Sequence, residues 1–230
     1  MNEIFASSAL LGTVLSLVCY FIGAKIKTRA KTAIANPLLI SVILVIVFLS
    51  LFRIDYASYQ ASAKYISWFL TPATVALAVP LYEQMERLRR NLAAVVIGIG
   101  MGTFSGILTI FLLSKLFGLE KAEFVTLLPK SVTTAIGIAV SEELGGYPSV
   151  TAAAIVITGI LGNVCAEGAC RVFRITEPVS KGLAIGTSSH AIGTSKAMEI
   201  GETEGAMSSL ALVLSGIITV AGASIITNIY

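Results

Sequence analysis

Long hydrophobic stretches alternate with short polar ones along the 230 residues. A helix needs about 20 residues to cross the hydrocarbon core of a bilayer, and several stretches come close to that length. The pattern predicts membrane spans at residues 4–24, 37–52, 92–113, 148–170 and 206–229. A further stretch, 124–140, is apolar apart from its hydroxyl groups and one lysine. The pattern as a whole predicts an all-α polytopic membrane protein.

Two other stretches are apolar enough for membrane depth but contain helix breakers. In "FLTPATVALAVPLYEQ", Pro72 and Pro80 remove backbone donors and interrupt regular helix. In "GLAIGTSSHAIGTSKAMEIG", residues 182–201, Gly186 and Gly193 are the predicted helix breaks. Both stretches are therefore expected to be broken or re-entrant helices.

The order of span, span, broken segment and span occurs twice. Pro37 and Pro148 each open a span and are separated by close to half of the chain. We therefore predict one integral membrane domain, residues 1–230, made of two structural repeats at about 1–115 and 116–230. Repeated halves with interrupted helices at matching positions are typical of secondary transporters.

Basic residues indicate how the halves are inserted. The alternating basic loop at 25–31 predicts a cytoplasmic loop and an external N-terminus. Halves of inverted orientation place more Lys and Arg inside than parallel halves, so the positive-inside rule favours inversion. An asymmetric alternative, in which the first broken segment crosses fully and 124–140 forms a hairpin, places still more of them inside. Internal symmetry is the reason for preferring inversion.

Composition agrees with a protein in a bilayer. The chain is 56% hydrophobic and only 13% charged, whereas soluble domains are about 25% charged. Membrane lipid is thus the expected surrounding. The net charge of +3 is small, and the basic residues lie between apolar runs, so no nucleic-acid partner is expected. The three cysteines have no metal-ligand spacing and are predicted to be small buried hydrophobes.

Lys130 is the first candidate for chemistry, because an ionised group at membrane depth usually faces a cavity or a partner. It follows Pro129, a predicted helix break, and precedes the hydroxyls of Ser131, Thr133 and Thr134. These residues would bind an anionic substrate. The alternative is a lysine that snorkels from a helix end.

His190, the one histidine of the chain, is the second candidate. It could relay a coupled proton, since its ordinary pKa lies near neutrality. It could also donate a hydrogen bond to substrate, or simply be a satisfied polar residue between helices. Nearby hydroxyls would bind ligand or satisfy freed backbone groups: Thr187, Ser188, Ser189, Thr194 and Ser195. Thr71 and Thr74 would contribute to the site from the first half.

Other polar and small residues allow more than one interpretation. Asn163 and Glu167 share a helix face and could line a pore or join two helices. Glycines at 98, 100, 102 and 106 predict close helix packing. A single histidine excludes a multi-histidine metal site, and no aspartate lies near it to complete a hydrolase triad. We expect no enzymatic activity, no metal and no cofactor.

Four stretches in the same order give a family resemblance: "NPLL", "TPATVALAVPLYEQ", "LPKSVTTAIGIAV" and "GTSSHAIGTSKA". Together they resemble the LrgB/CidB family of bacterial membrane proteins over nearly the whole chain. The matching positions include Pro72, Pro80, Lys130, Ser131, His190 and Thr194. One departure is Ala135, where the family commonly has proline; it weakens the transfer of ligand contacts to Thr133 and Thr134.

The resemblance implies a multi-pass protein of the bacterial inner membrane. Members are described as antiholin- or holin-like, modulating murein hydrolase activity and lysis, and plastid relatives are glycolate/glycerate translocators. The leading expectation is a secondary transporter of small monocarboxylates, with possible proton coupling through His190. The alternative is a holin- or antiholin-like lysis regulator. The expected partners are a small anionic carboxylate and, in the second case, further copies of the chain or a small holin-like membrane protein.

Overall fold

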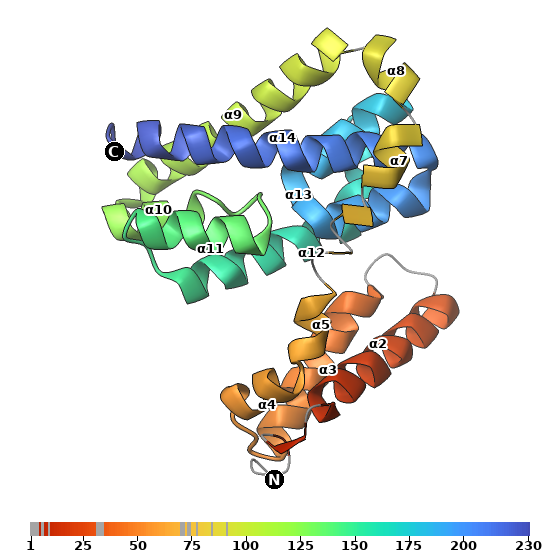
Figure 1. Cartoon of the computed structure of the whole chain (residues 1–230). Coiled ribbons are helices and arrows are strands. Elements are labelled where there is room, and N and C mark those ends of the chain that lie inside the picture. Colours follow the sequence, from red (N-terminus) through yellow and green to blue (C-terminus); the bar gives the residue numbers. More distant parts are fainter. Residues whose placement is uncertain are drawn as a thin grey trace. The chain divides into compact units, whose positions relative to one another are not determined.

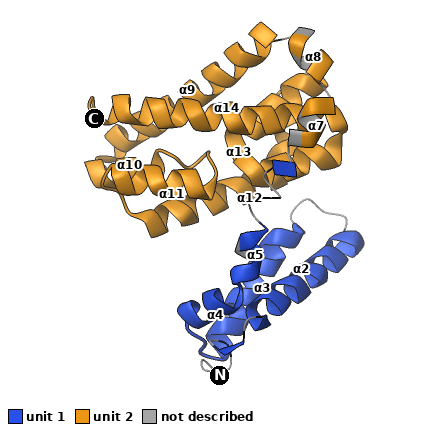
Figure 2. Cartoon of the chain, in the orientation of Figure 1, with its two compact units in different colours: residues 1–76 blue, residues 77–230 orange. Residues whose placement is uncertain are grey.

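The structure is a computed structural model that describes residues 5, 7–8, 10–30, 35–69, 72, 75–76, 78–83, 85–90 and 92–230. The described residues are helical or lie in turns, with no β-strand among them (Figure 1). By internal contacts the chain divides into two compact units, residues 1–76 and 77–230 (Figure 2). The predicted all-α class is thus confirmed, whereas the division into two equivalent inverted repeats stays a prediction.

The first unit contains α2 (Leu11–Ala30), α3 (Pro37–Leu51), α4 (Tyr56–Ser62) and α5 (Lys64–Trp68). Helix α3 begins where "NP" predicts it. The side chain of Asn36 accepts hydrogen bonds from the backbone N–H groups of Leu38 (2.8 Å) and Leu39 (3.2 Å), and Pro37 needs no partner at the first helical position. With 15 residues, α3 agrees with the predicted stretch 37–52 but is shorter than the about 20 residues of a full bilayer crossing.

The second unit contains the elements that position the site. They are α7 (Ala78–Glu83), α8 (Met85–Arg90), α9 (Leu92–Phe117), α10 (Lys121–Leu127), α11 (Thr134–Glu143), α12 (Pro148–Val172), α13 (Pro178–Ile200) and α14 (Glu202–Thr227). Among the described segments, α2, α9, α12 and α14 are long and apolar enough to cross a membrane. Helix α14 packs along α13 and also contacts α9 (Figure 1).

The buried residues of helix α14 are mostly small or polar, with Met207 and Leu212 as exceptions, and several of its large apolar residues are exposed. Ser208, Ser215 and Thr219 are buried, whereas Val213 and Ile217 are more than half exposed. A water-soluble helix has the opposite arrangement, because its apolar side chains leave water. In lipid, small residues allow close helix approach and hydroxyls find partners between helices. The arrangement is that of a helix whose outer face contacts hydrocarbon.

The stretch 124–140 is not the single span that the inverted arrangement requires. It forms α10 and α11, joined by a turn at residues 128–133. The chain folds back on itself there, since Val140 packs in one cluster with Phe124 and Val125. Pro129 explains the interruption, because it has no N–H to continue the helix. This is the hairpin of the asymmetric alternative for this segment.

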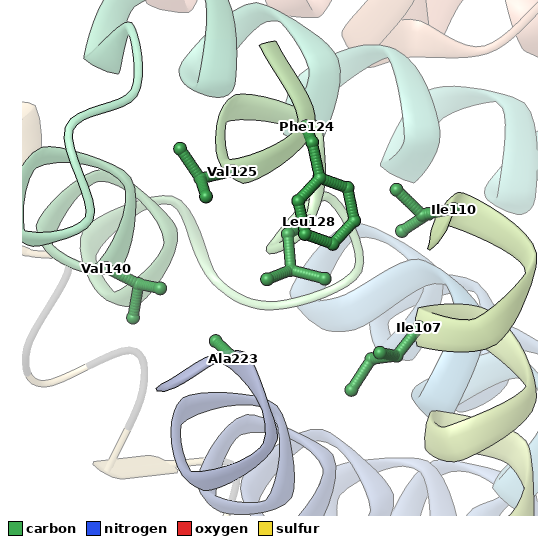
Figure 3. Close-up of a cluster of buried hydrophobic side chains, with 7 residues drawn as sticks. All are labelled: Ile107, Ile110, Phe124, Val125, Leu128, Val140 and Ala223. Carbon is green, nitrogen blue, oxygen red and sulfur yellow. The ribbon is translucent and has the colours of Figure 1, made fainter. Parts of the chain in front are cut away.

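A hydrophobic cluster joins this hairpin to α9 and α14. Figure 3 shows its members: Ile107, Ile110, Phe124, Val125, Leu128, Val140 and Ala223. Phe124 is fully buried, and its ring stacks on Tyr230 with centroids 4.1 Å apart. Tyr230 also donates a hydrogen bond from its hydroxyl to the Leu119 carbonyl (2.6 Å). The hairpin is therefore fixed by packing on both neighbouring helices.

Removing the Phe124 ring is expected to destabilise the second unit. Phe124→Ala should lower the free energy of unfolding by about 3–5 kcal/mol, as other buried phenylalanine truncations do. Equilibrium unfolding in mixed detergent micelles measures the change. Phe117→Ala is the matched control, because that ring is 74% exposed. Equal effects of the two substitutions would contradict the packing described here.

Two sequence predictions change in detail. Cys19 and Cys170 are buried as expected, but Cys165 is exposed on α12, which corrects the prediction for that residue. Pro80 lies in the first turn of α7. The backbone N–H groups of the first turn have no acceptor within the helix. A proline there, which has no N–H group, therefore removes no helical hydrogen bond.

Candidate functional site

A cavity of about 680 Å³ lies within the second unit. Its wall consists of one face of α9 from Ala94 to Ile110, the turn between α10 and α11, the first half of α13, and Thr219 of α14. This volume is in the range of ligand-binding pockets. Most of the lining is apolar, so a few polar side chains determine what the cavity can bind.

Lys130 supplies the positive charge of this wall. The residue lies in the turn between α10 and α11, is half-buried, and donates from Nζ to Ser131 Oγ at 3.1 Å. No carboxylate of the described residues lies within ion-pair distance of Nζ. The other charged lining residue, Glu177, is occupied at the N-terminus of α13, where its Oε2 accepts from the Ser180 N–H (2.7 Å). The ammonium group is thus available to an anion.

The glycines of α9 have different roles from one another. A methyl group at Gly102 would lie 3.0 Å from Cγ2 of Thr187, so α9 and α13 approach closely there, as predicted. At Gly100 and Gly106 an added methyl group would meet nothing within 4 Å. Gly102 and Gly106 also line the cavity. The close-packing prediction is therefore right for Gly102 and wrong for Gly100 and Gly106.

Helix α13 breaks at His190, between the two glycines at which breaks were predicted. His190 has φ 43° and ψ −142°, a backbone conformation that favours glycine, while Gly186 and Gly193 lie within helical turns. The glycines allow close contacts instead: Gly186 lies against the Ser208 backbone, and Gly193 against Ser189. The stretch is a broken helix, as predicted, but the break is held by tertiary contacts.

The His190 side chain is not among the lining residues of the cavity and packs against α12. Its Nε2 lies 2.9 Å from the Ile155 carbonyl oxygen and donates a hydrogen bond to it. A methyl group at Gly159 would lie 2.6 Å from the imidazole ring, so the glycine makes room for it. The hydroxyl of Thr194 donates to the His190 carbonyl (2.9 Å), which satisfies one backbone group near the break. His190 therefore connects two helices.

His190→Ala is expected to lower stability more than it lowers ligand affinity. The change removes the hydrogen bond to Ile155 and leaves a void in a buried site, at a cost of about 2–4 kcal/mol. Thermal unfolding of the purified protein in detergent measures it, with Thr109→Ala as the control, because Thr109 is exposed and does not line the cavity. An unchanged unfolding temperature combined with lost ligand binding would instead assign the ring to the ligand.

Asn163 and Glu167 both connect α12 to the second half of α13. Asn163 Nδ2 donates to the Ile192 carbonyl (2.9 Å), and Glu167 Oε1 pairs with Lys196 Nζ at 2.6 Å. The sequence left open whether Asn163 and Glu167 line a pore or join two helices, and these contacts favour the second alternative.

The structure brings some of the predicted site residues together and separates others. The cavity is lined by Lys130, Ser131, Thr187 and Ser188. Thr133, Thr134, Ser189, His190 and Thr194 are not among its lining residues. Thr71 and Thr74 lie outside the described residues, and Pro72 is described without its neighbours 71 and 73. Whether these residues contact a ligand is not decided by their positions, so their roles stay predictions.

Sequence reasoning missed four polar residues of the wall: Thr103, Glu177, Ser180 and Thr219. Thr103 lies in a predominantly apolar span, next to glycines interpreted as packing residues. The same span also contains the hydroxyls of Ser105 and Thr109, so no sequence signal distinguished Thr103 from them.

Helices with lipid-type outer faces, a broken helix and a cavity with one lysine are the features of an all-helical membrane protein. A family model described as the LrgB-like family matches residues 16–229. The chain belongs to this family, which confirms the resemblance found in its sequence motifs.

Curated relatives agree with this assignment. The chain is 37% identical over 210 residues to the antiholin-like protein LrgB of Bacillus cereus (strain B4264), and the alignment covers 91% of each chain. The antiholin-like protein LrgB of Bacillus anthracis (strain A0248) matches with the same identity and coverage. No solved structure matches the chain.

Proposed function

We propose that this protein is a multi-pass, antiholin-like protein of the bacterial inner membrane that restrains murein hydrolase activity and lysis. The observation that carries the proposal is the 37% identity, over 91% of both chains, to proteins named antiholin-like. Because a relative of this identity and coverage shares the whole fold, the comparison favours this role over any other. On this proposal the partners are a small holin-like membrane protein or further copies of the chain.

Autolysis of bacterial cells tests the antiholin-like role. The chain is expressed in a strain from which the genes of this family have been deleted, and lysis is started with a mild detergent. We expect slower loss of optical density and weaker murein hydrolase bands in zymograms than with an unrelated membrane protein expressed at the same level. Identical lysis rates in cells that express this chain and in cells that express the unrelated membrane protein would overturn the proposal.

A second candidate function is the transport of small monocarboxylates such as pyruvate, glycolate or glycerate. The cavity favours it, since a pocket of about 680 Å³ contains Lys130 without a carboxylate partner among the described residues. A lysine ammonium group in an apolar wall attracts a carboxylate more strongly than one in water. The expectation of two inverted repeats, with alternating access to the site, belongs to this candidate.

Uptake into proteoliposomes tests the transport function. We expect saturable entry of labelled pyruvate, glycolate or glycerate, measured with and without a proton gradient. A large dye trapped inside the proteoliposomes serves as the control. The dye stays inside if the protein is a carrier and leaks out if the protein forms an open pore. Absence of saturable uptake for all three acids would overturn the transport function and leave the antiholin-like role untouched.

A further inference from the structure

Thr103 on α9 has a buried hydroxyl without a partner. The residue is 6% exposed, and its Oγ1 is the one buried side-chain oxygen or nitrogen of the described residues that has no hydrogen-bond partner. Many other hydroxyls have partners, including that of Thr109 on the same helix, which donates to the Ser105 carbonyl at 2.7 Å. An unpaired buried hydroxyl is unfavourable, so its presence requires an explanation.

The position of Thr103 gives that explanation. Its side chain lines the cavity together with Lys130. It follows Gly102, which approaches Thr187, and precedes by one turn Ile107, which packs in the same cluster as Leu128 of the hairpin. These neighbours place Thr103 near the end of the cavity that contains Lys130.

The hydroxyl can change its direction by one side-chain rotation. In the structure its oxygen is enclosed, but a turn of about 120° about χ1 brings the hydroxyl to the place of the methyl group and moves the methyl group to the place of the Cβ hydrogen. The rotation breaks no hydrogen bond, because the hydroxyl has none among the described residues. A ligand oxygen in the cavity would therefore supply the missing partner.

We propose that Thr103 determines ligand specificity: its hydroxyl hydrogen-bonds a second oxygen group of an anion whose carboxylate is bound at Lys130. The cavity then selects hydroxy or oxo acids over acids of the same length that lack the second oxygen. This inference rests on the proposed carboxylate transport and adds a residue and a selection rule to it. The preference has an energetic reason: an acid without the second oxygen leaves the Thr103 hydroxyl unpaired in the cavity wall, which costs binding free energy.

Matched pairs of acids test the selection rule with the full-length protein in detergent or nanodiscs. The pairs are acetate and glycolate, propionate and 3-hydroxypropionate, and butyrate and 4-hydroxybutyrate, and affinity is measured by isothermal titration. We expect the hydroxy acid to bind roughly tenfold more tightly in at least one pair, the value of one hydrogen bond. The chain length of that pair then reports the distance between the two contacts.

Three variants assign the effect to Thr103. Thr103→Val, of nearly equal shape, should reduce the ratio within that pair to about one while the plain acid binds as before. Thr103→Ser should keep the preference, and Thr109→Val should be without effect, because that hydroxyl is exposed and bonded within its own helix. Without ligand, Thr103→Val should unfold at the same or a higher temperature than the parent protein, because it loses an unpaired polar group.

Each contrary result has a distinct meaning. If the parent protein binds no acid of the set, this inference is overturned, whereas the transport function is decided separately by the uptake of pyruvate, glycolate and glycerate. If it binds acids without a preference in any pair, or if Thr103→Val keeps the preference, this inference alone is overturned. A lower unfolding temperature for Thr103→Val would show that the hydroxyl already has a structural partner, and would also overturn it.

Discussion

Gly186→Val is expected to prevent normal packing of α13 against α14. A side chain at Gly186 would collide with the Ser208 carbonyl oxygen and lie 2.8 Å from its Cα atom. Backbone atoms cannot move aside as a flexible side chain can, so the two helices must separate. We expect a loss of about 3 kcal/mol of unfolding free energy, the upper end of the usual cost of overpacking, measured as a lower unfolding temperature and a smaller yield of monodisperse protein.

Gly100→Val is the matched control for this substitution. Gly100 is also within a long helix, but an added methyl group there meets nothing within 4 Å. The same change in side chain should therefore leave yield and unfolding temperature close to those of the parent protein. If both variants lost stability equally, a general preference for glycine would be responsible, and the close contact with Ser208 would not be the cause.

Lys130→Met is expected to weaken the binding of small carboxylates strongly. The substitution keeps much of the side-chain length but removes the positive charge from the cavity wall, whose other charged residue, Glu177, repels anions. A charge-assisted hydrogen bond contributes about 1.5–3 kcal/mol, so affinity should fall by roughly 10- to 150-fold. Uptake into proteoliposomes and isothermal titration both measure the loss.

Two further variants separate charge from fold. Lys130→Arg keeps the charge and should retain part of the affinity. Lys181→Met removes a lysine from α13 that does not line the cavity, and should bind like the parent protein. Equal binding by Lys130→Met and the parent protein would show that Lys130 is a lysine at a helix end, with its ammonium group directed to the membrane surface.

The sequence predicted local features well. The start of α3 follows from Asn36 and Pro37, because a cap and a fixed φ act within a few residues. The spans at α9, α12 and α14 follow from length and hydropathy. Lys130 was found because a charge in an apolar stretch is conspicuous, and the structure places it in the cavity wall.

Features that depend on contacts between distant residues could not be predicted. The break at His190 depends on Ile155, Gly159 and Thr194, and nothing in the sequence around a histidine specifies a positive φ. The return of the 124–140 stretch depends on packing against α9 and α14. Thr103 was missed because it differs from the other hydroxyl residues of α9 only in lacking a hydrogen-bond partner. The absence of a hydrogen bond cannot be recognised from a sequence pattern.

The arrangement of α14, with hydroxyls inside and branched apolar side chains outside, has a thermodynamic consequence. Unfolding a soluble domain exposes apolar surface to water and therefore raises the heat capacity strongly. In a bilayer, Val213 and Ile217 contact hydrocarbon before and after the helices separate, and the surfaces that separate are rich in serine, threonine and glycine. The heat-capacity change of helix dissociation is then small, so the stability of this protein varies with temperature along a nearly straight line and cold does not destabilise it.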